Sequence, residues 1–364
     1  MFTLHKPLLA VLIGLSVTLP ATAASPHSSD QVLFISTRDG NAQIYVMDAD
    51  GDHPRALTHG PAENTEPAWS PDGQRIAFTS YRDGNAEIYV MNPDGTHVSC
   101  LTDHPLADSA PAWTPDGRIV FRSMRHGHSE IFLMDANGGN LKRLTDSRLD
   151  KGPPLVSPDG TRIAFIGIDP ADLSQQVYVM PIDAGEVRQL TAGKEQKYSP
   201  AWSPDGQRIA YVERKGDHLS IWVAVVDTGQ SVKITDTPKF SNTQPVWSPD
   251  GRRIAFVSSR DGGAVEQARG DIYVMDADGG NVANLTRHPD EDNHPVWSAD
   301  GSRIYFVSLR DGYAQIYSVR ADGSEQQRVT WSVGSDLRIT PRNPGGNASS
   351  RMAGAGLASN TSMH

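Results

Sequence analysis

The sequence contains a single cysteine, Cys100, among its 364 residues. One cysteine excludes an intramolecular disulfide, so the fold has to be stabilised by packing. We expect Cys100 to be a small buried apolar residue, the common use of a free cysteine. An excess of basic residues is also missing, because the net charge is -10 and both signs are interspersed. This balance argues against nucleic acid or an anionic membrane surface as the main partner.

Long apolar runs are absent after the first two dozen residues. At the start, a basic pair precedes an apolar segment at 8–19 and small residues at 21–23, the pattern of an export signal with its cleavage site. We interpret residues 1–24 as a signal peptide. No later stretch approaches the roughly 18 apolar residues that a membrane-spanning helix needs. The sequence therefore predicts a soluble, exported, periplasmic protein with no membrane span.

What the sequence does contain is one phrase repeated six times, close to Pro-Ala-Trp-Ser-Pro-Asp-Gly. Its successive aspartates are 44, 43, 46, 45 and 50 residues apart, at Asp72, Asp116, Asp159, Asp205, Asp250 and Asp300. A regular period of this length is the signature of a solenoid or a propeller. The repeat therefore decides the fold class before any single element is considered.

Each repeat unit reads as four short antiparallel strands. After the phrase come two apolar runs, such as 75–80 and 88–91, separated by a turn at 82–84, and then a short run ending at Thr102. Runs rich in Val, Ile, Tyr and Phe, bounded by Asp-Gly turns, are typical of β-strands. Because the runs are apolar at nearly every position, both faces of each small sheet must be covered by neighbouring sheets. We therefore predict an all-β propeller built from four-stranded antiparallel blades.

A tryptophan recurs at one place in the repeat, and we expect it to pack between blades. It is replaced once, by Val156, so that blade should be the least well packed. The recurring residues are Trp69, Trp113, Trp202, Trp247 and Trp297.

The two apolar runs in the middle of the unit occur seven times, which predicts seven blades, with six as the alternative. The first copy, which begins at Val32, lacks its innermost strand. We predict that a C-terminal strand at 337–341 supplies it and closes the ring. Residues 25–341 would then form one propeller domain. The remaining segment, 342–364, is small and polar, which predicts a disordered tail.

The phrase Pro-x-Trp-Ser-Pro-Asp-Gly-x-x-Ile-Ala-Phe, followed by Ile-Tyr-Val-Met-Asp, resembles the WD-like propeller repeat of the TolB family. The resemblance extends from Gln31 to about Pro341. It implies a periplasmic propeller in the cell envelope that binds another protein over its axial mouth. Members of that family carry an α/β domain before a six-bladed propeller, whereas about seven residues separate the predicted cleavage site from the first strand here. We therefore expect a TolB-like propeller without that domain.

Two recurring features favour structural roles. The Asp-Gly turns lack the ligand spacing of a calcium loop and match what tight hairpins require. An arginine also recurs before the second turn of the unit. A residue repeated around a ring is expected to stabilise each blade, by an ion pair within it. These arginines are Arg38, Arg82, Arg125, Arg214, Arg260 and Arg310.

Function is expected where the copies differ, on the innermost strands that surround the axis. The residue before each inner-strand proline varies from copy to copy, and so does the residue three positions before it. The latter set, Asn64, Asp108, Lys151, Lys197, Asn242 and Asp292, predicts a polar ring of mixed charge. Our hypothesis for a binding mouth consists of Glu66, Tyr198, Gln244, His294 and Arg338.

Two classes of function are consistent with these residues. The sequence shows no nucleophile elbow, cysteine nucleophile or phosphate loop, which favours a binding module for a protein or peptide partner, working as a monomer. The alternative is a metal-dependent lyase or hydrolase for acidic oligosaccharides, with a divalent metal in the axial channel held by His294 with Glu66 or Gln244. His126 and His128 belong to a hairpin that should lie at the rim. We assign no catalytic residue and no metal ligand.

Overall fold

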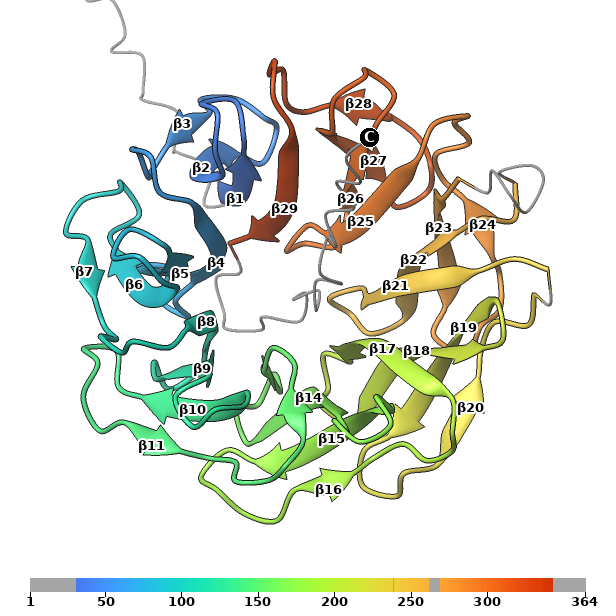
Figure 1. The fold of residues 1–364 in the computed structure, drawn as a ribbon. Helices are drawn as coiled ribbons and strands as arrows, with labels where there is room; N and C mark the ends of the chain where they lie inside the picture. Colours follow the sequence, from blue (N-terminus) through green and yellow to red (C-terminus); the bar gives the residue numbers. More distant parts are fainter. Residues whose placement is uncertain (1–30, 238, 262–268, 343–364) are drawn as a thin grey trace, which may run out of the picture.

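Seven small β-sheets surround a common axis in the computed structural model (Figure 1). The structure describes residues 31–237, 239–261 and 269–342. The predicted signal peptide and nearly all of the predicted tail lie outside these residues. Within them, no helix is long and apolar enough to cross a membrane.

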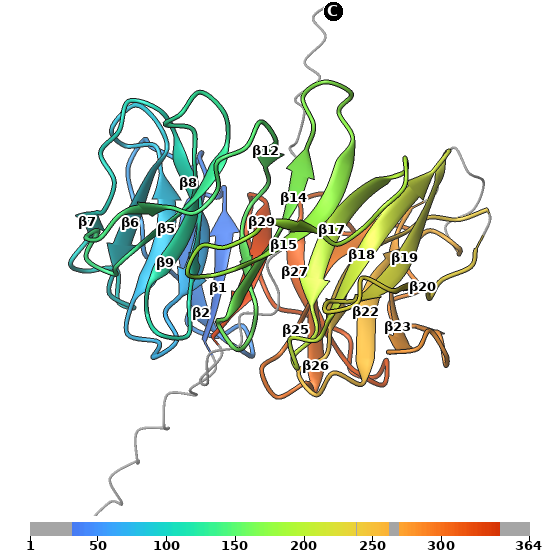
Figure 2. The same cartoon turned by 90° about the horizontal axis from the view of Figure 1, so that it is seen from below.

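The strands follow one another from the axis outward in each blade, as Figure 1 shows. Figure 2 shows the same ring from the side. Blade 1 contains β29 (Asp336–Pro341), β1 (Gln31–Ser36), β2 (Gln43–Asp48) and β3 (Arg55–Ala56). Blade 2 contains β4 (Asn64–Trp69), β5 (Ile76–Ser80), β6 (Glu87–Met91) and β7 (Ser99–Cys100). Blade 3 contains β8 (Asp108–Trp113), β9 (Ile119–Ser123), β10 (Glu130–Met134) and β11 (Lys142–Arg143).

The remaining blades follow the same order. Blade 4 contains β12 (Asp150–Lys151), β13 (Leu155–Val156), β14 (Arg162–Ile168), β15 (Gln175–Pro181) and β16 (Arg188–Gln189). Blade 5 contains β17 (Gln196–Trp202), β18 (Arg208–Lys215), β19 (His218–Val225) and β20 (Ser231–Lys233). Blade 6 contains β21 (Asn242–Trp247), β22 (Arg253–Ser258), β23 (Asp271–Asp276) and β24 (Ala283–Asn284). Blade 7 contains β25 (Asp292–Trp297), β26 (Arg303–Ser308), β27 (Gln315–Arg320) and β28 (Gln327–Arg328).

The predicted seven blades are confirmed, and so is the closure of the ring by the C-terminal strand. Strand β29 pairs antiparallel with β1, with Thr340 opposite Leu33 and Asp336 opposite Ser36. Beyond β29, the Arg342 guanidinium lies over the Trp69 ring, 5.2 Å from its centroid, and donates to the Gly73 carbonyl at 3.1 Å. The first and last described strands therefore share blade 1, and Arg342 joins it to blade 2.

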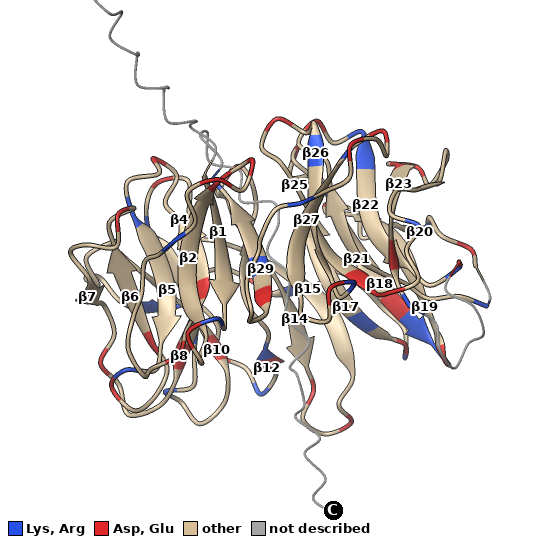
Figure 3. Ribbon diagram, turned by 90° about the horizontal axis from the view of Figure 1, so that it is seen from above, with Lys and Arg blue, Asp and Glu red and all other residues tan. Residues whose placement is uncertain are grey.

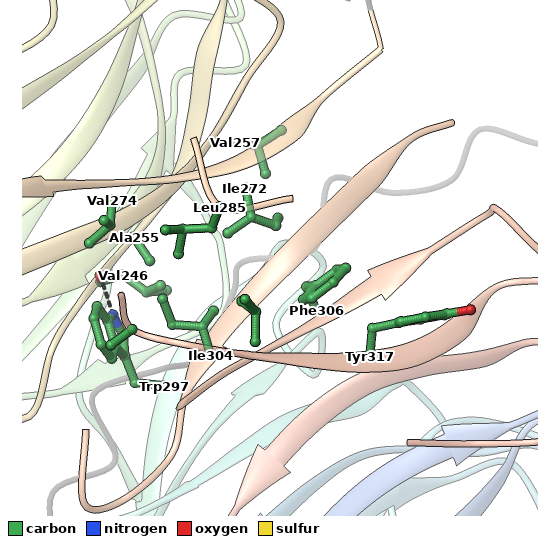
Figure 4. Close-up of a cluster of buried hydrophobic side chains, with 12 residues drawn as sticks. Val246, Ala255, Val257, Ile272, Val274, Leu285, Trp297, Ile304, Phe306 and Tyr317 are labelled. Atoms are coloured by element: carbon green, nitrogen blue, oxygen red, sulfur yellow. Dashed lines mark hydrogen bonds between the residues drawn. The ribbon is translucent and has the colours of Figure 1, made fainter. Parts of the chain in front are cut away.

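The core lies between the blades. Figure 4 shows the cluster between blades 6 and 7, where Val246 and Val274 face Trp297 and Ile304. The Trp297 indole N–H donates to the Val246 carbonyl of the preceding blade at 3.2 Å, so the predicted packing of tryptophan between blades is confirmed. Trp113, Trp202 and Trp247 make the same inter-blade bond.

Blade 4 differs from the others in its inner strand, which is split into β12 and β13. Pro153 and Pro154 lie in the interruption, where neither residue can donate a ladder hydrogen bond. Val156 pairs with Ile163 on β14. Whether this blade is the least well packed stays a prediction.

The threonine at the end of each unit has one repeated structural role. In all seven blades its hydroxyl accepts a hydrogen bond from the main-chain amide of a buried aliphatic residue on the third strand. The distance is 2.9 Å from Ile44 to Thr58 and 2.9 Å from Ile316 to Thr330. The recurring threonine therefore supplies a hydroxyl acceptor for a main-chain amide in each blade.

Cys100 is exposed, contrary to the expectation of a buried residue. It lies on β7, the outermost strand of blade 2, where both residues are exposed. The short outer strands have no further strand beside them, which leaves their side chains near solvent.

Candidate functional site

The residue before the inner-strand proline has a left-handed backbone conformation in almost every blade. In blade 1 the next residue is Ile339 in place of proline. The φ values are +56° at Glu66, +55° at Ala110, +48° at Ser199, +54° at Gln244, +54° at His294 and +51° at Arg338. The seventh residue is Pro153, whose ring fixes φ near -65°. A non-glycine residue in this conformation costs roughly 1–2 kcal/mol, so the repeat maintains a strained position next to the axis.

This conformation coincides with a β-bulge in the inner strand. In blade 2 the pairing of β4 with β5 shifts between Thr65 and Ala68, and the same kind of shift occurs in five other blades. A bulge leaves one residue unpaired and redirects its side chain. We call the left-handed residues at this position the bulge residues, namely Glu66, Ala110, Ser199, Gln244, His294 and Arg338.

Glu66 connects three blades. Its Oε2 accepts from the Thr79 hydroxyl at 2.9 Å and from the Ala110 amide of blade 3 at 2.7 Å. Its Oε1 lies 3.4 Å from Nη1 of Arg338 in blade 1. Burial opposes ionisation, but Arg338 and these hydrogen bonds outweigh it, with Arg122 contributing as well, and the pKa of Glu66 is held below its ordinary value. The side chain is therefore a carboxylate at neutral pH.

Gln244 repeats this arrangement in blade 6. Its Oε1 accepts the His294 amide of blade 7 at 2.7 Å. The His294 Nδ1 lies 2.6 Å from Asn293 Oδ1. Burial, together with the charge of Arg338, lowers the pKa of His294 below its ordinary value. The imidazole is thus neutral at pH 7.

The five predicted mouth residues are therefore not one cluster. Glu66 contacts Arg338, Gln244 contacts the main chain of His294, and the Arg338 charge acts on His294. Tyr198 is different: it precedes the bulge residue Ser199, packs against the core between blades 5 and 6, and donates its hydroxyl to Gln196. It is half-buried on β17 beside the other inner strands.

The residues three positions before the inner-strand proline are polar and of mixed charge, as expected, but all of them are buried. The aspartates among them pair with recurring arginines: Asp108 with Arg125 at 2.6 Å, and Asp292 with Arg310 at 2.9 Å. The two lysines pair with glutamates instead, Lys151 with Glu130 at 2.8 Å and Lys197 with Glu213 at 3.1 Å. Asp336 binds Arg38 in the same way, and Arg82 and Arg260 donate to Asn64 and Asn242. The predicted ion pair within the blade is confirmed for Arg38, Arg125 and Arg310. Arg82 and Arg260 make a hydrogen bond to a neutral asparagine instead, and Arg214 donates to Gly216.

Arg122 is a residue near the axis that the sequence reasoning missed. It lies on β9 opposite Ser109, and its Nε and Nη2 donate to the Ser109 hydroxyl at 3.2 and 3.0 Å. The signal was present, because the strand registers place an apolar residue at the same position in five of the seven blades: Ile35, Ile166, Val212, Val257 and Val307. Arg122 is the charged exception at this position, and it lies on the same side of the axis as Glu66.

These side chains can interact with other groups through charge and hydrogen bonds. Among residues 31–237, 239–261 and 269–342, no three His, Cys, Asp or Glu side chains come together in a way that could hold a metal ion. Lysine and arginine (blue) and aspartate and glutamate (red) are interspersed over the ring in Figure 3. His126 and His128 lie between β9 and β10, in the hairpin where they were expected.

Comparison with known proteins gives the family. The TolB β-propeller domain family matches residues 14–104, 100–199 and 161–347. The chain belongs to the TolB β-propeller family. A curated relative, the Tol-Pal system protein TolB of Desulfosudis oleivorans, is 46% identical over 44 residues, which is 12% of this chain and 10% of the relative. That match is about the length of one blade of this TolB-like propeller.

Solved structures extend the likeness over most of the chain. The crystal structure of TolB from Acinetobacter baumannii is 25% identical with a TM-score of 0.53, and the match covers 71% of this chain and 64% of that one. An oligogalacturonate lyase in complex with manganese has a TM-score of 0.68 at 19% identity, over 82% of this chain and 88% of the lyase. A puromycin hydrolase has a TM-score of 0.67 at 15% identity, over 82% of this chain and 52% of the hydrolase. The two enzymes share the fold with this TolB-like propeller.

Proposed function

We propose that this TolB-like propeller is exported to the periplasm and binds a protein or peptide partner over the inner strands around its axis, as part of the cell envelope. The observation that carries the proposal is the variation among the bulge residues. This repeated position presents an acid, an amide, an imidazole and a guanidinium, beside the small side chains of Ala110 and Ser199. Variation at one repeated position beside the axis suits the recognition of an asymmetric partner.

Family membership supports a partner that is a protein. The Acinetobacter and Desulfosudis relatives are both TolB, and the Desulfosudis protein is a Tol-Pal system protein. The match covers 64% of the Acinetobacter TolB. The activity of that whole protein is therefore attributed to this chain only as a proposal. The predicted signal peptide supports the location.

The test is capture from envelope extract with the mature chain as bait. His294→Ala and Gln244→Ala should each reduce the captured partner, because they alter adjacent bulge residues. His53→Ala is the matched control, since its side chain is 84% exposed on a turn between β2 and β3. Capture that is equal for all four baits, or no capture at all, would count against an axial binding site.

The alternative hypothesis is a metal-dependent lyase or hydrolase for acidic oligosaccharides. The fold is shared with a lyase that binds manganese, but Glu66 is occupied by Arg338, Thr79 and Ala110, and His294 is hydrogen-bonded to Asn293. The geometry therefore supports binding better than catalysis. Metal analysis of the purified protein, with His294→Ala beside it, tests the alternative: a stoichiometric divalent ion that the variant loses would favour the lyase.

A further inference from the structure

Two arginines beside the axis differ from the recurring arginines in what they contact. Most of the recurring arginines face an oxygen of an inner-strand Asp or Asn: Arg310, for example, donates from Nη2 to both oxygens of Asp292 at 3.0 and 2.9 Å and stacks on Tyr317. Arg338 is one-third exposed, and within the described part of the sequence its one ion-pair partner is Glu66, at 3.4 Å. Arg122 directs two of its nitrogens at a single hydroxyl, that of Ser109. Both guanidinium groups therefore retain N–H groups that can donate to a ligand.

These two arginines act on the same carboxylate from opposite sides. Arg338 belongs to blade 1 and Arg122 to blade 3, and the positive charge of each favours the ionised form of Glu66 in blade 2. The inner strands of these three blades, β29, β4 and β8, are consecutive around the axis in Figure 1. Burial raises the pKa of Tyr81, which is 46% exposed, and the charges of Glu66, Glu63 and Arg122 act on it as well. Arg338, Arg122 and Glu66 together carry two positive charges and one negative charge.

Glu66 itself has little capacity left to accept further hydrogen bonds. Its Oε2 already accepts two hydrogen bonds, from Thr79 and Ala110. These bonds fix the carboxylate, and the carboxylate in turn orients Arg338. The N–H donors of Arg122 and Arg338 therefore outnumber the acceptor sites that Glu66 offers them, which favours the binding of an anionic group.

We infer that Arg122 and Arg338 bind a carboxylate of the partner, and that Glu66, which lies between them, competes with it for Arg338. The inference rests on the proposed function, which supplies a protein or peptide as the source of the carboxylate. A planar guanidinium matches a carboxylate in size and geometry and can bind it through two parallel N–H bonds. An acidic side chain and the C-terminus of a peptide present the same group, and the experiment below separates them.

The experiment is an NMR titration of the mature protein labelled with ¹⁵N-arginine. Three probes are compared: N-acetylglutamate amide, whose carboxylate is on the side chain; N-acetylglutamine, which has a terminal one; and N-acetylglutamine amide, which has none. The Nε–H signals of Arg122 and Arg338 are assigned with the Arg→Lys variants. We expect one or both carboxylate probes to shift both signals to saturation, with the neutral probe leaving them unchanged.

The exposed Arg252 is the internal control, because it lies in the turn between β21 and β22, and its signal should not move. Removing one guanidinium, by Arg122→Gln or Arg338→Gln, should weaken binding by about tenfold. Glu66→Gln should tighten it by at least about threefold, because a competing anion is removed. This gain cannot result from unfolding.

Several results would overturn the inference. They are equal shifts with the neutral probe, no shift with either carboxylate, or weaker binding by Glu66→Gln. A shift caused by galacturonate and by neither carboxylate probe would also overturn it, in favour of an acidic sugar. The titration needs no partner, so its failure is distinct from the failure of envelope capture: each experiment can succeed without the other.

Discussion

The Oε1 atom of Gln244 accepts the main-chain amide of His294 at 2.7 Å, across the boundary between blades 6 and 7. Glu66 makes the same contact with Ala110 between blades 2 and 3. In both cases the side chain of one bulge residue accepts a hydrogen bond from the main-chain amide of the bulge residue in the next blade. That amide is left unpaired within its own sheet by the bulge. The strained position is therefore both a binding candidate and a joint between blades.

Replacing Gln244 tests this joint. Gln244→Ala leaves the His294 amide without its acceptor, and we expect the free energy of unfolding to fall by about 1–2 kcal/mol. Gln244→Glu keeps an acceptor of the same length and should remain within about 0.5 kcal/mol of the wild type. Urea unfolding of the three proteins measures both values. An alanine variant as stable as the glutamate variant would show that the bond does not join the blades.

The lowered pKa of Glu66 predicts how stability depends on pH. A carboxyl group whose pKa is lower in the folded protein contributes stability above its unfolded pKa, about 4.3, and that contribution is lost as the pH falls through the folded pKa. We therefore expect the wild type to exceed Glu66→Gln in melting temperature at pH 7, with the difference shrinking below about pH 4. Thermal unfolding from pH 3 to 8 measures this. A constant difference over that range would contradict the assigned cause.

The repeat predicted the fold because its period, turns and apolar runs are local features. The seven blades and the closing strand follow from counting copies, and the inter-blade role of tryptophan follows from its size. Cys100 was placed wrongly, because the sequence does not show that the side chains of the last, short strand of each unit are exposed at the rim.

The candidate site was predictable only in part. The variation at Glu66, Gln244, His294 and Arg338 could be seen in aligned copies, but the positive φ that brings them out of the ladder could not. The same alignment could have identified Arg122, had the second strand been compared as closely as the first. Burial of the residues three positions earlier, such as Asp108, depends on the arginine that folds back from the next turn.

A buried ion pair between blades 3 and 4 gives a third prediction. Lys151 Nζ lies 2.8 Å from Glu130 Oε2, and both side chains are almost fully buried. Burial raises the pKa of Glu130, but its hydrogen-bond partners and neighbouring charges, with Lys151 the main contributor, outweigh burial and hold the pKa at about 2. Lys151→Met would leave that carboxylate short of its main partner, and we expect a loss of about 3 kcal/mol in the free energy of unfolding.

The control for this pair comes from the protein itself. Blades 1 and 2 have a neutral pair at the same place, where Asn64 Nδ2 donates to Gln43 Oε1 at 3.0 Å. The double variant Glu130→Gln with Lys151→Asn copies that pair and should recover most of the lost stability. Chemical denaturation of the two variants decides the matter: a double variant less stable than Lys151→Met would mean that the charges themselves are required.

Truncation gives the last prediction, because three lengths of the protein separate the closing strand from Arg342 and the residues after it. A protein that ends at Arg342 keeps β29 and the Arg342 contacts with Trp69 and Gly73, and should melt like the full-length one. A protein that ends at Thr330 loses β29, including the buried Ile339 and the Asp336 partner of Arg38. We expect its melting temperature to fall by about 10 °C.

A protein that ends at Pro341 isolates the contribution of Arg342. The Trp69 indole N–H has no hydrogen-bond partner among the described residues, unlike the tryptophans that bond to a preceding blade. The stacked Arg342 guanidinium therefore adds a polar contact to the apolar packing of that ring against Leu33 and Ile44 of blade 1. We expect this protein to melt about 2–4 °C below the one ending at Arg342. Calorimetry of the three truncations measures both steps. Equal melting temperatures for the proteins ending at Thr330 and Arg342 would show that β29 does not close the ring, whatever its pairing with β1.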